Sequence, residues 1–280
     1  LNNCGIAYKE LKKYSDAANC YEKALLLNPN YAETYCNLGI LHTAMNQIPL
    51  ALHNFDKAIG LKPDYAEAFN NKGVALNELM DLDHAILNYQ KAIDLNPNYA
   101  DAHYNKGYAL LLQGNLQQGL MEHEWRRQLP GYLNLAPNLS KPIWLGDTVI
   151  SDKTILVICE QGLGDIIQFS RFIKPLSLIA KQVLFAVPET LIAPLDTKTE
   201  RVTIINELQI PEDFDYYIPL LSLPLALKVN KIENIASTPP QIANDSKKIL
   251  GWNCRLGPKK GQLRVGINWS GNPSFKKDGL

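Results

Sequence analysis

The sequence predicts an α-helical repeat solenoid followed by an α/β unit with a parallel sheet. Two observations support this prediction. Over the first part of the chain, small residues, aromatic residues and prolines recur every 34 residues. Farther along, short β-branched apolar runs alternate with helical patterns. A period of that length is typical of stacked helix hairpins, and such alternation is typical of a parallel sheet covered by helices.

The composition indicates a globular protein without a strong overall charge. The chain has 280 residues, of which 46% are hydrophobic, and its 28 basic residues balance 28 acidic ones. We therefore expect no general attraction to nucleic acid or to anionic membranes. No apolar run approaches the roughly 20 residues that a membrane-spanning helix needs. Five scattered cysteines without a CxxC pair suggest buried thiols in a reducing compartment, so we expect a cytoplasmic protein.

The repeats are defined by residues that return at the same position of each unit. Small residues allow two antiparallel helices to approach, an aromatic residue fills the space between repeats, and a proline ends the unit. The pattern resembles the tetratricopeptide repeat over residues 1–127, with about four repeats, of which the first is incomplete and the last degenerate. The recurring sets are Gly5, Gly39, Gly73 and Gly107; Ala17, Ala51 and Ala85; Tyr21, Phe55 and Tyr89; Ala24, Ala58 and Ala92; and Pro29, Pro63 and Pro97.

An asparagine also recurs at this period, two residues before each glycine, as Asn3, Asn37, Asn71 and Asn105. The resemblance implies that this position faces the concave groove of the repeat superhelix. An amide there can donate to and accept from the backbone of an extended peptide. Similar ladders occur in the repeats of protein O-linked sugar transferases. The other interpretation is that asparagine is simply common at this position.

The fourth repeat departs from the pattern. Gly119, His123 and Arg126 stand where alanine, an aromatic residue and alanine are expected, so we expect this repeat to dock onto the next domain. The histidines all lie in the repeats, several at aromatic positions, and packing is favoured over metal binding; we predict no metal site. A linker rich in proline and glycine follows at 128–149. Its bulky residue Trp144, like the segment 124–127, is interpreted as an interdomain anchor.

The remaining sequence predicts a doubly wound parallel sheet. Ligands of such sheets bind at the carboxyl ends of the strands, where residues 160–165 and 270–272 follow predicted strands. The predicted strands are 154–158, 182–187, 202–205, 216–219 and 264–269, and the predicted helices are 166–180, 190–195, 220–227 and 247–255.

Three motifs in this part resemble a known enzyme family: EQGLGD at 160–165, LSLP at 221–224 and RVGINWSGNP at 264–273. They are similar to repeat-linked proteins related to the heptosyltransferase-type (family 9) glycosyltransferases, which have the two-domain GT-B fold. The resemblance implies that residues 150–260 form the N-terminal Rossmann-like domain and that 261–280 begin the second. Because the second domain supplies most of the donor site in that fold, we expect residues 1–280 alone to bind no donor tightly.

The resemblance implies metal-independent, inverting sugar transfer from a nucleotide sugar, which is a substrate, with no cofactor. Asp165 matches the proposed base that removes the proton of the acceptor hydroxyl. The alternative role of Asp165 is a helix N-cap, in which a carboxylate accepts backbone hydrogen bonds. Glu160 and Gln161 could bind acceptor hydroxyls, while Gly162 and Gly164 allow a tight turn and close approach of a ligand. The residues expected near the donor phosphates are Ser270, Gly271, Asn272 and Lys276.

Two other functions follow from the same residues. The first is a non-catalytic scaffold that binds proteins through its repeats and carries a degenerate transferase-like half. The second is an oxidoreductase, which the sequence disfavours because the glycine turn lacks the third glycine of a dinucleotide-binding motif. The sequence therefore leaves two interpretations: a glycosyltransferase with Asp165 as its base, whose repeats recruit an acceptor that can be a protein, or a non-catalytic scaffold that binds proteins.

Overall fold

The structure is a computed structural model that describes residues 1–132, 139–160, 162–195 and 199–235. The predicted strand 264–269 and helix 247–255 lie outside these residues, as does the whole of the predicted start of a second domain at 261–280.

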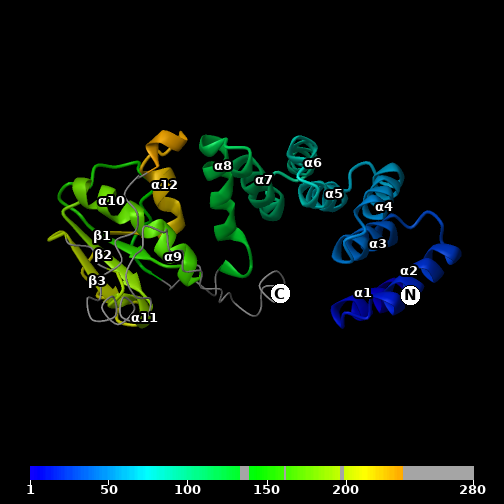
Figure 1. Cartoon of the computed structure of the whole chain (residues 1–280). Helices are drawn as coiled ribbons and strands as arrows, with labels where there is room; N and C mark the ends of the chain where they lie inside the picture. Colours follow the sequence, from blue (N-terminus) through cyan, green and yellow to red (C-terminus); the bar gives the residue numbers. More distant parts are fainter. Residues whose placement is uncertain (133–138, 161, 196–198, 236–280) are drawn as a thin grey trace, which may run out of the picture. The chain divides into compact units, whose positions relative to one another are not determined.

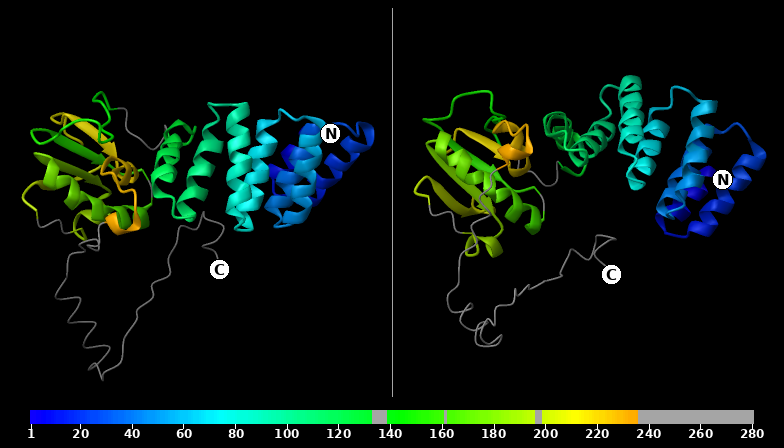
Figure 2. Two further views of the ribbon diagram at one scale, coloured as in Figure 1. Left: turned by 90° about the horizontal axis from the view of Figure 1, so that it is seen from above. Right: turned by 45° about the horizontal axis from the view of Figure 1, so that its top comes forward.

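Residues 1–128 form helix hairpins in sequence order (Figure 1). Each hairpin pairs an odd-numbered helix with the next even-numbered one, and the first helices of successive repeats also contact one another. The antiparallel pairs can be followed from blue to green in Figure 2. The helices are α1 (Asn2–Glu10), α2 (Tyr14–Leu27), α3 (Ala32–Ala44), α4 (Ile48–Leu61), α5 (Ala66–Glu78), α6 (Leu82–Leu95), α7 (Ala100–Leu112) and α8 (Leu116–His123), followed by the 3-10 helix η1 (Glu124–Gln128).

The recurring glycines are required by close contact between the two helices of a hairpin. In the second repeat, a Cβ on Gly39 would overlap the ring of Phe55, which is fully buried. The first and third repeats show the same contact, with Tyr21 and Tyr89 as the buried rings. In the fourth repeat the same glycine position meets the backbone of α8 instead. The predicted helix approach is confirmed.

The turn inside each hairpin also repeats. It contains a residue in the left-handed region at the same repeat position: Lys12 (φ 58°), Asn46 (φ 58°), Met80 (φ 59°) and Gly114 (φ 82°). This conformation reverses the chain after one helix and is easiest for glycine. Three of the four turns therefore hold a side chain in a conformation that costs roughly 1–2 kcal/mol.

A four-stranded parallel sheet follows, with strand order β3-β2-β1-β4. The first four strand predictions are confirmed: β1 is Thr154–Ile158, β2 is Gln182–Val187, β3 is Val202–Asn206 and β4 is Tyr216–Pro219. The end of the predicted linker belongs to this sheet, because Trp144 N donates to Tyr217 O (2.9 Å) and Tyr217 N donates to Pro142 O (3.1 Å). Trp144, 2% exposed, lies in the α/β core rather than in a free connector.

The helices of this half pack on one main core. Ile155 and Val157 of β1 face that core, while Leu156 and Ile158 face a smaller cluster that includes Phe214 from a loop. The helical segments are α9 (Leu163–Phe169), η3 (Ser170–Phe172), α10 (Ile173–Ile179), α11 (Glu189–Ile192), η4 (Leu220–Ser222), α12 (Leu223–Ala226) and η5 (Ile232–Asn234).

Two connections between strands depart from a regular crossover helix. The connection between β3 and β4, residues 207–215, contains no helix, and none was predicted there, whereas the strand order reverses at β1 as in a doubly wound sheet. The connection is short and includes Pro211, which disfavours a crossover helix. The predicted helix 166–180 is interrupted by η3, because Pro175 has no N–H to donate to the carbonyl of Arg171.

Candidate functional site

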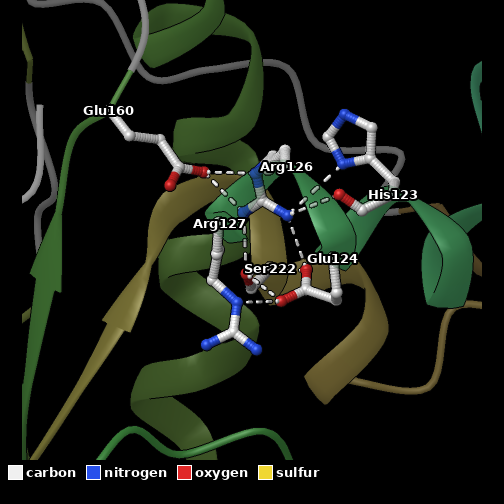
Figure 3. Close-up of polar contacts among 6 residues, drawn as sticks. All are labelled: His123, Glu124, Arg126, Arg127, Glu160 and Ser222. Carbon is white, nitrogen blue, oxygen red and sulfur yellow. Dashed lines mark hydrogen bonds and ion pairs between the residues drawn. The ribbon is translucent and has the colours of Figure 1, made fainter. Parts of the chain in front are cut away.

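A buried network of charged groups joins the end of the repeats to the carboxyl ends of β1 and β4 (Figure 3). We call its residues Glu124, Arg126, Glu160 and Ser222 the junction. Arg126 lies in η1 and is 3% exposed, and Glu160, two residues beyond β1, is 4% exposed. Arg126 Nη2 donates to Glu160 Oε1 at 2.6 Å, and Arg126 Nε donates to the same oxygen at 3.1 Å.

The remaining donors of Arg126 are also engaged. Nη2 donates to Ser222 Oγ (2.8 Å), and Nη1 donates to Glu124 Oε1 (2.7 Å) and to the carbonyl of His123 (3.3 Å). Ser222 Oγ donates in turn to Glu124 Oε1 (2.8 Å). Arg127 Nε forms an ion pair with Glu124 Oε2 at 3.1 Å. The two arginines and two carboxylates thus balance in charge, and the guanidinium of Arg126 is saturated by protein groups.

The electrostatics fit a structural role. Burial opposes the charge of Arg126, but the carboxylates of Glu160 and Glu124 outweigh it and raise the pKa of Arg126 above its ordinary value. Burial, together with the charge of Arg126, lowers the pKa of His123 from 6.5 to about 4. His123 is therefore neutral at physiological pH, and its ring packs against Tyr104 with centroids 5.3 Å apart.

The second carboxylate oxygen of Glu160 lacks a hydrogen-bond donor among the described residues. Glu160 Oε2 is buried and accepts no hydrogen bond of good geometry from the described residues. Burial, together with Glu160, raises the pKa of Tyr132. Glu160, predicted to bind an acceptor hydroxyl, is instead held by Arg126 and withdrawn from solvent.

Asp165 is the third residue of α9. Its side chain is half-buried and does not cap the helix. The N-cap is Gly162, and no side chain caps this helix end. Burial raises the pKa of Asp165. Its charge also reaches Tyr104 in α7, whose pKa is raised mainly by burial. The cap interpretation of Asp165 is wrong, while its predicted role as a base is not tested by this geometry.

The other predicted site residues are divided between two places. Gly162 and Gly164 lie exposed at the start of α9, and a Cβ on either would meet no neighbouring atom. Neither glycine is therefore required by packing in this structure. The predicted ligand residues outside the described part of the chain are Gln161, Ser270, Gly271, Asn272 and Lys276.

An apolar pocket of about 230 Å³ lies beside α9. Leu111, Leu116 and Leu120 contribute from the repeats, and Phe169 and Phe172 from the α/β half. Neither Asp165 nor Glu160 lines it. The pocket is thus separate from the predicted catalytic position.

The asparagine ladder forms a regular set of bonds between repeats. Asn37 Nδ2 donates to Asn2 Oδ1 (3.0 Å), and Asn105 Nδ2 donates to Asn70 Oδ1 (3.0 Å). Asn71 Nδ2 lies 3.9 Å from Cys36 Sγ. Each bond reaches back to the residue just before the equivalent asparagine of the preceding repeat. Asn37, Asn71 and Asn105 are half-buried and Asn3 is exposed, and no hydrogen bond to a ladder Oδ1 atom is seen among the described residues.

The histidines of the fourth repeat pack as predicted. The ring of His103 stacks on Trp125, with centroids 3.9 Å apart and planes 4° apart, and His103 Nδ1 contacts Glu122 Oε2 at 2.5 Å. In the ranges that the structure describes, no group of three or more His, Cys, Asp or Glu could hold a metal ion. The helices of those ranges include none long and apolar enough to cross a membrane.

Sequence reasoning anticipated that the fourth repeat docks onto the next domain, and the junction confirms this. Ser222 lies in the motif at 221–224, but no role was predicted for it, and Tyr104 and Tyr132 were not singled out. The sequence signal that could have predicted the junction was Arg126 itself. A charged residue at a repeat position that normally holds a small, buried residue requires a buried partner.

Comparisons with known proteins agree with the repeat assignment. A family model described as "TPR repeat" matches residues 5–46 and 77–114, and one described as "Tetratricopeptide repeat" matches 36–91. Neither reaches the α/β half, so they give no support to the resemblance to glycosyltransferases. No curated protein matches the chain.

Solved structures of tetratricopeptide-repeat proteins are similar to part of the chain. A thermophilic repeat protein of Thermus thermophilus is 21% identical, with a TM-score of 0.44, covering 48% of this chain and 74% of that one. MamA of Desulfovibrio magneticus is 25% identical, with a TM-score of 0.41, covering 45% and 73%. The first repeat domain of Spaghetti (RPAP3), bound to an HSP90 peptide, is 22% identical, with a TM-score of 0.39, covering 40% and 89%.

These TM-scores are low, so the assignment rests on the family models and on the contacts described above. The N-terminal part of this chain is an array of tetratricopeptide repeats.

Proposed function

We propose that the protein is a binding scaffold whose repeats hold an extended segment of a partner protein against their first helices. The observation that carries the proposal is the asparagine ladder. Three amides, those of Asn37, Asn71 and Asn105, are oriented by the same kind of contact to the preceding repeat. The tetratricopeptide assignment supports it independently, because repeats that stack in this way create extended binding surfaces.

The ladder suits a peptide backbone because it is already ordered before binding. Each amide uses one N–H within the array, which leaves its oxygen as an acceptor and its second N–H as a donor. A side chain fixed in advance loses less conformational entropy when it binds. Since such amides bind backbone groups, which every residue carries, the array would bind partner segments of many different sequences.

The spacing of the ladder sets the shape of the partner. Packed helices lie about 8–10 Å apart, and an extended chain rises about 3.3 Å per residue. Successive ladder residues would therefore meet about every third residue of an extended segment. We propose a partner segment of roughly nine residues or more, without helical structure while bound.

A selection from a displayed library of random peptides tests the proposal. The best peptide is synthesised, and its affinity for the whole chain is measured by calorimetry. Replacing two ladder residues, Asn71→Ala with Asn105→Ala, should weaken binding by about 5- to 150-fold, corresponding to about 0.5–1.5 kcal/mol for each lost hydrogen bond.

The matched control uses two asparagines of the second helices, Asn54→Ala with Asn88→Ala. These are also 34 residues apart, and each donates only to a carbonyl of its own helix. The control should bind as tightly as the wild type. Equal weakening by both pairs, or by neither, would contradict a role for the ladder.

A second candidate function is sugar transfer with Asp165 as the base. It is supported by the strand order, which reverses at β1, since ligands of open parallel sheets bind where the order reverses. Asp165 does not cap α9, and burial raises its pKa. A carboxylate with a raised pKa is a better general base. The burial of Glu160 in the junction speaks against an open acceptor site. Nucleotide-sugar hydrolysis by the wild type that disappears in Asp165→Asn would support this function, and equal turnover by both would exclude Asp165 from it.

A further inference from the structure

The asparagine ladder has a row of carboxylates on one side. The first helices of the second, third and fourth repeats each carry an acidic residue four positions before the ladder asparagine: Glu33, Glu67 and Asp101. Because residues four apart lie on the same face of a helix, these carboxylates stand beside the ladder, one turn nearer the helix N-terminus. We call these three residues the acidic row.

The carboxylates of the acidic row are accessible to a partner. Glu67 and Asp101 are exposed, and neither forms an ion pair with a basic side chain among the described residues. Glu33 is half-buried, and its Oε1 lies 3.5 Å from Lys62 Nζ, but a pair as exposed as this one contributes little stability. The row therefore holds negative charge that the described part of the chain leaves largely unneutralised.

Stabilisation of the helices alone does not explain the row. An acidic residue in the first turn stabilises any helix through its dipole. The second helices would benefit equally, yet α4 and α8 have no acidic residue in the first turn. The first helices α3, α5 and α7 each have one, always at the same position relative to the ladder. This regular placement points to a role on the face that the ladder occupies.

The electrostatics agree with a position close to the ladder. Burial, together with the charges of Glu67 and Glu33, raises the pKa of Cys36 to about 12. Cys36 is the residue that the ladder amide of Asn71 contacts. The negative charge of the row thus acts at the ladder itself, where the backbone of a partner would lie.

On its other side the ladder has a row of apolar side chains. Three positions after the ladder asparagines stand Ile6, Ile40, Val74 and Tyr108. Residues three apart also share a helix face, so this apolar row flanks the ladder one turn nearer the helix C-terminus. Tyr108 is 50% exposed and Ile6 is 36% exposed, while Ile40 and Val74 are half-buried. The ladder therefore runs between a charged row and an apolar one.

We propose that the partner segment alternates basic and apolar residues, with its lysines or arginines over the acidic row and its apolar side chains over the apolar row. The inference rests on the proposed function, because the ladder defines the line along which the partner's backbone runs. Successive side chains of an extended chain point to opposite sides, so one set faces each row. The acidic row also repels acidic segments and so selects against them.

Designed peptides test the proposal. The probe is a peptide with blocked ends that alternates lysine and valine over about ten residues, which spans the ladder at about 3.3 Å per residue. Two comparison peptides carry glutamine or glutamate in place of every lysine. Affinity for the whole chain is measured by calorimetry at low and at high salt. We expect the lysine peptide to bind most tightly and the glutamate peptide least tightly, with a smaller difference at high salt because exposed charges are screened.

Variants of the chain locate the effect. Glu67→Gln with Asp101→Asn should weaken binding of the lysine peptide by about 2- to 30-fold, the effect of losing two exposed ion pairs, and leave binding of the glutamine peptide unchanged. The matched control is Asp16→Asn with Asp83→Asn, which removes first-turn carboxylates of two second helices and changes the net charge equally. It should bind the lysine peptide as tightly as the wild type. Circular dichroism checks that each variant keeps its helices.

The outcomes separate this inference from the proposed function. If Asn71→Ala with Asn105→Ala weakened binding but the lysine and glutamine peptides bound equally, the ladder would keep its role and the basic partner would be overturned. A preference for the glutamate peptide, equal weakening by the acidic-row variant and its control, or no binding of the lysine peptide would overturn it too. Binding that depended on the acidic row and not on the ladder would support a basic partner and contradict the proposed function.

Discussion

The substitution Glu160→Gln tests the junction, because it removes one charge and little volume. In the wild type, Arg126 donates two hydrogen bonds to Glu160 Oε1, and both side chains are almost fully buried. Breaking a buried ion pair on one side typically costs about 3–5 kcal/mol, since the other charge is left uncompensated. Glu124 and Ser222 still bind Arg126 in the variant, so we expect the lower end, about 3 kcal/mol.

The assay is urea unfolding followed by circular dichroism, with hydrogen exchange to locate the loss. With a slope of about 1–3 kcal/mol per molar urea, the midpoint should fall by about 1 M or more. Exchange should increase in β1 and in η1 together, because the junction ties these elements to each other. Retained protection in one of them would show that the network does not couple the two halves.

A surface ion pair provides the control. Lys62 Nζ lies 3.5 Å from Glu33 Oε1, and the two side chains are 43% and 44% exposed. Exposed pairs contribute about 0–1 kcal/mol, so Glu33→Gln should shift the midpoint little. If Glu160→Gln proved no more destabilising than Glu33→Gln, our account of the junction would be refuted.

Three further predictions concern single positions in the repeats. The pKa of His123 is lowered from 6.5 to about 4, so between these values the unfolded chain binds a proton that the folded chain does not. The stabilisation from neutral His123 is complete above pH 6.5 and is lost as the pH falls towards 4, by about 3 kcal/mol. His123→Gln should flatten the dependence of unfolding free energy on pH over this range, and parallel curves would disprove the assignment. Tyr21→Phe should stabilise the chain by about 1 kcal/mol in urea unfolding, because the buried hydroxyl finds no hydrogen-bond partner among the residues that the structure describes; a destabilised variant would indicate a partner for it. Met80→Gly should raise the unfolding free energy by about 1 kcal/mol by relieving a left-handed residue at φ 59°, whereas Met80→Ala should not.

The local structure was predictable because it depends on patterns of short range. The 34-residue period fixed the helix hairpins and placed Tyr21, Phe55 and Tyr89 in the core, where each ring lies against a glycine. The alternation of apolar runs located β1 to β4 within a residue.

The parts that were missed depend on contacts between distant residues. Arg126 and Glu160 do not belong to a common sequence motif. Only the folded chain shows that the carboxylate of Glu160 is bound by Arg126. Trp144 appeared to belong to a linker because prolines and glycines surround it, yet its neighbours pair with the edge of β4.

The central claim is that the first helices of the repeats, and their asparagines in particular, hold a peptide. The most direct measurement is the change in ¹H–¹⁵N NMR signals of the whole chain on adding the selected peptide. We predict that the side-chain amide signals of Asn37, Asn71 and Asn105 shift and that those of Asn54 and Asn88 stay in place. Shifts confined to the second helices or to the α/β half would contradict the claim.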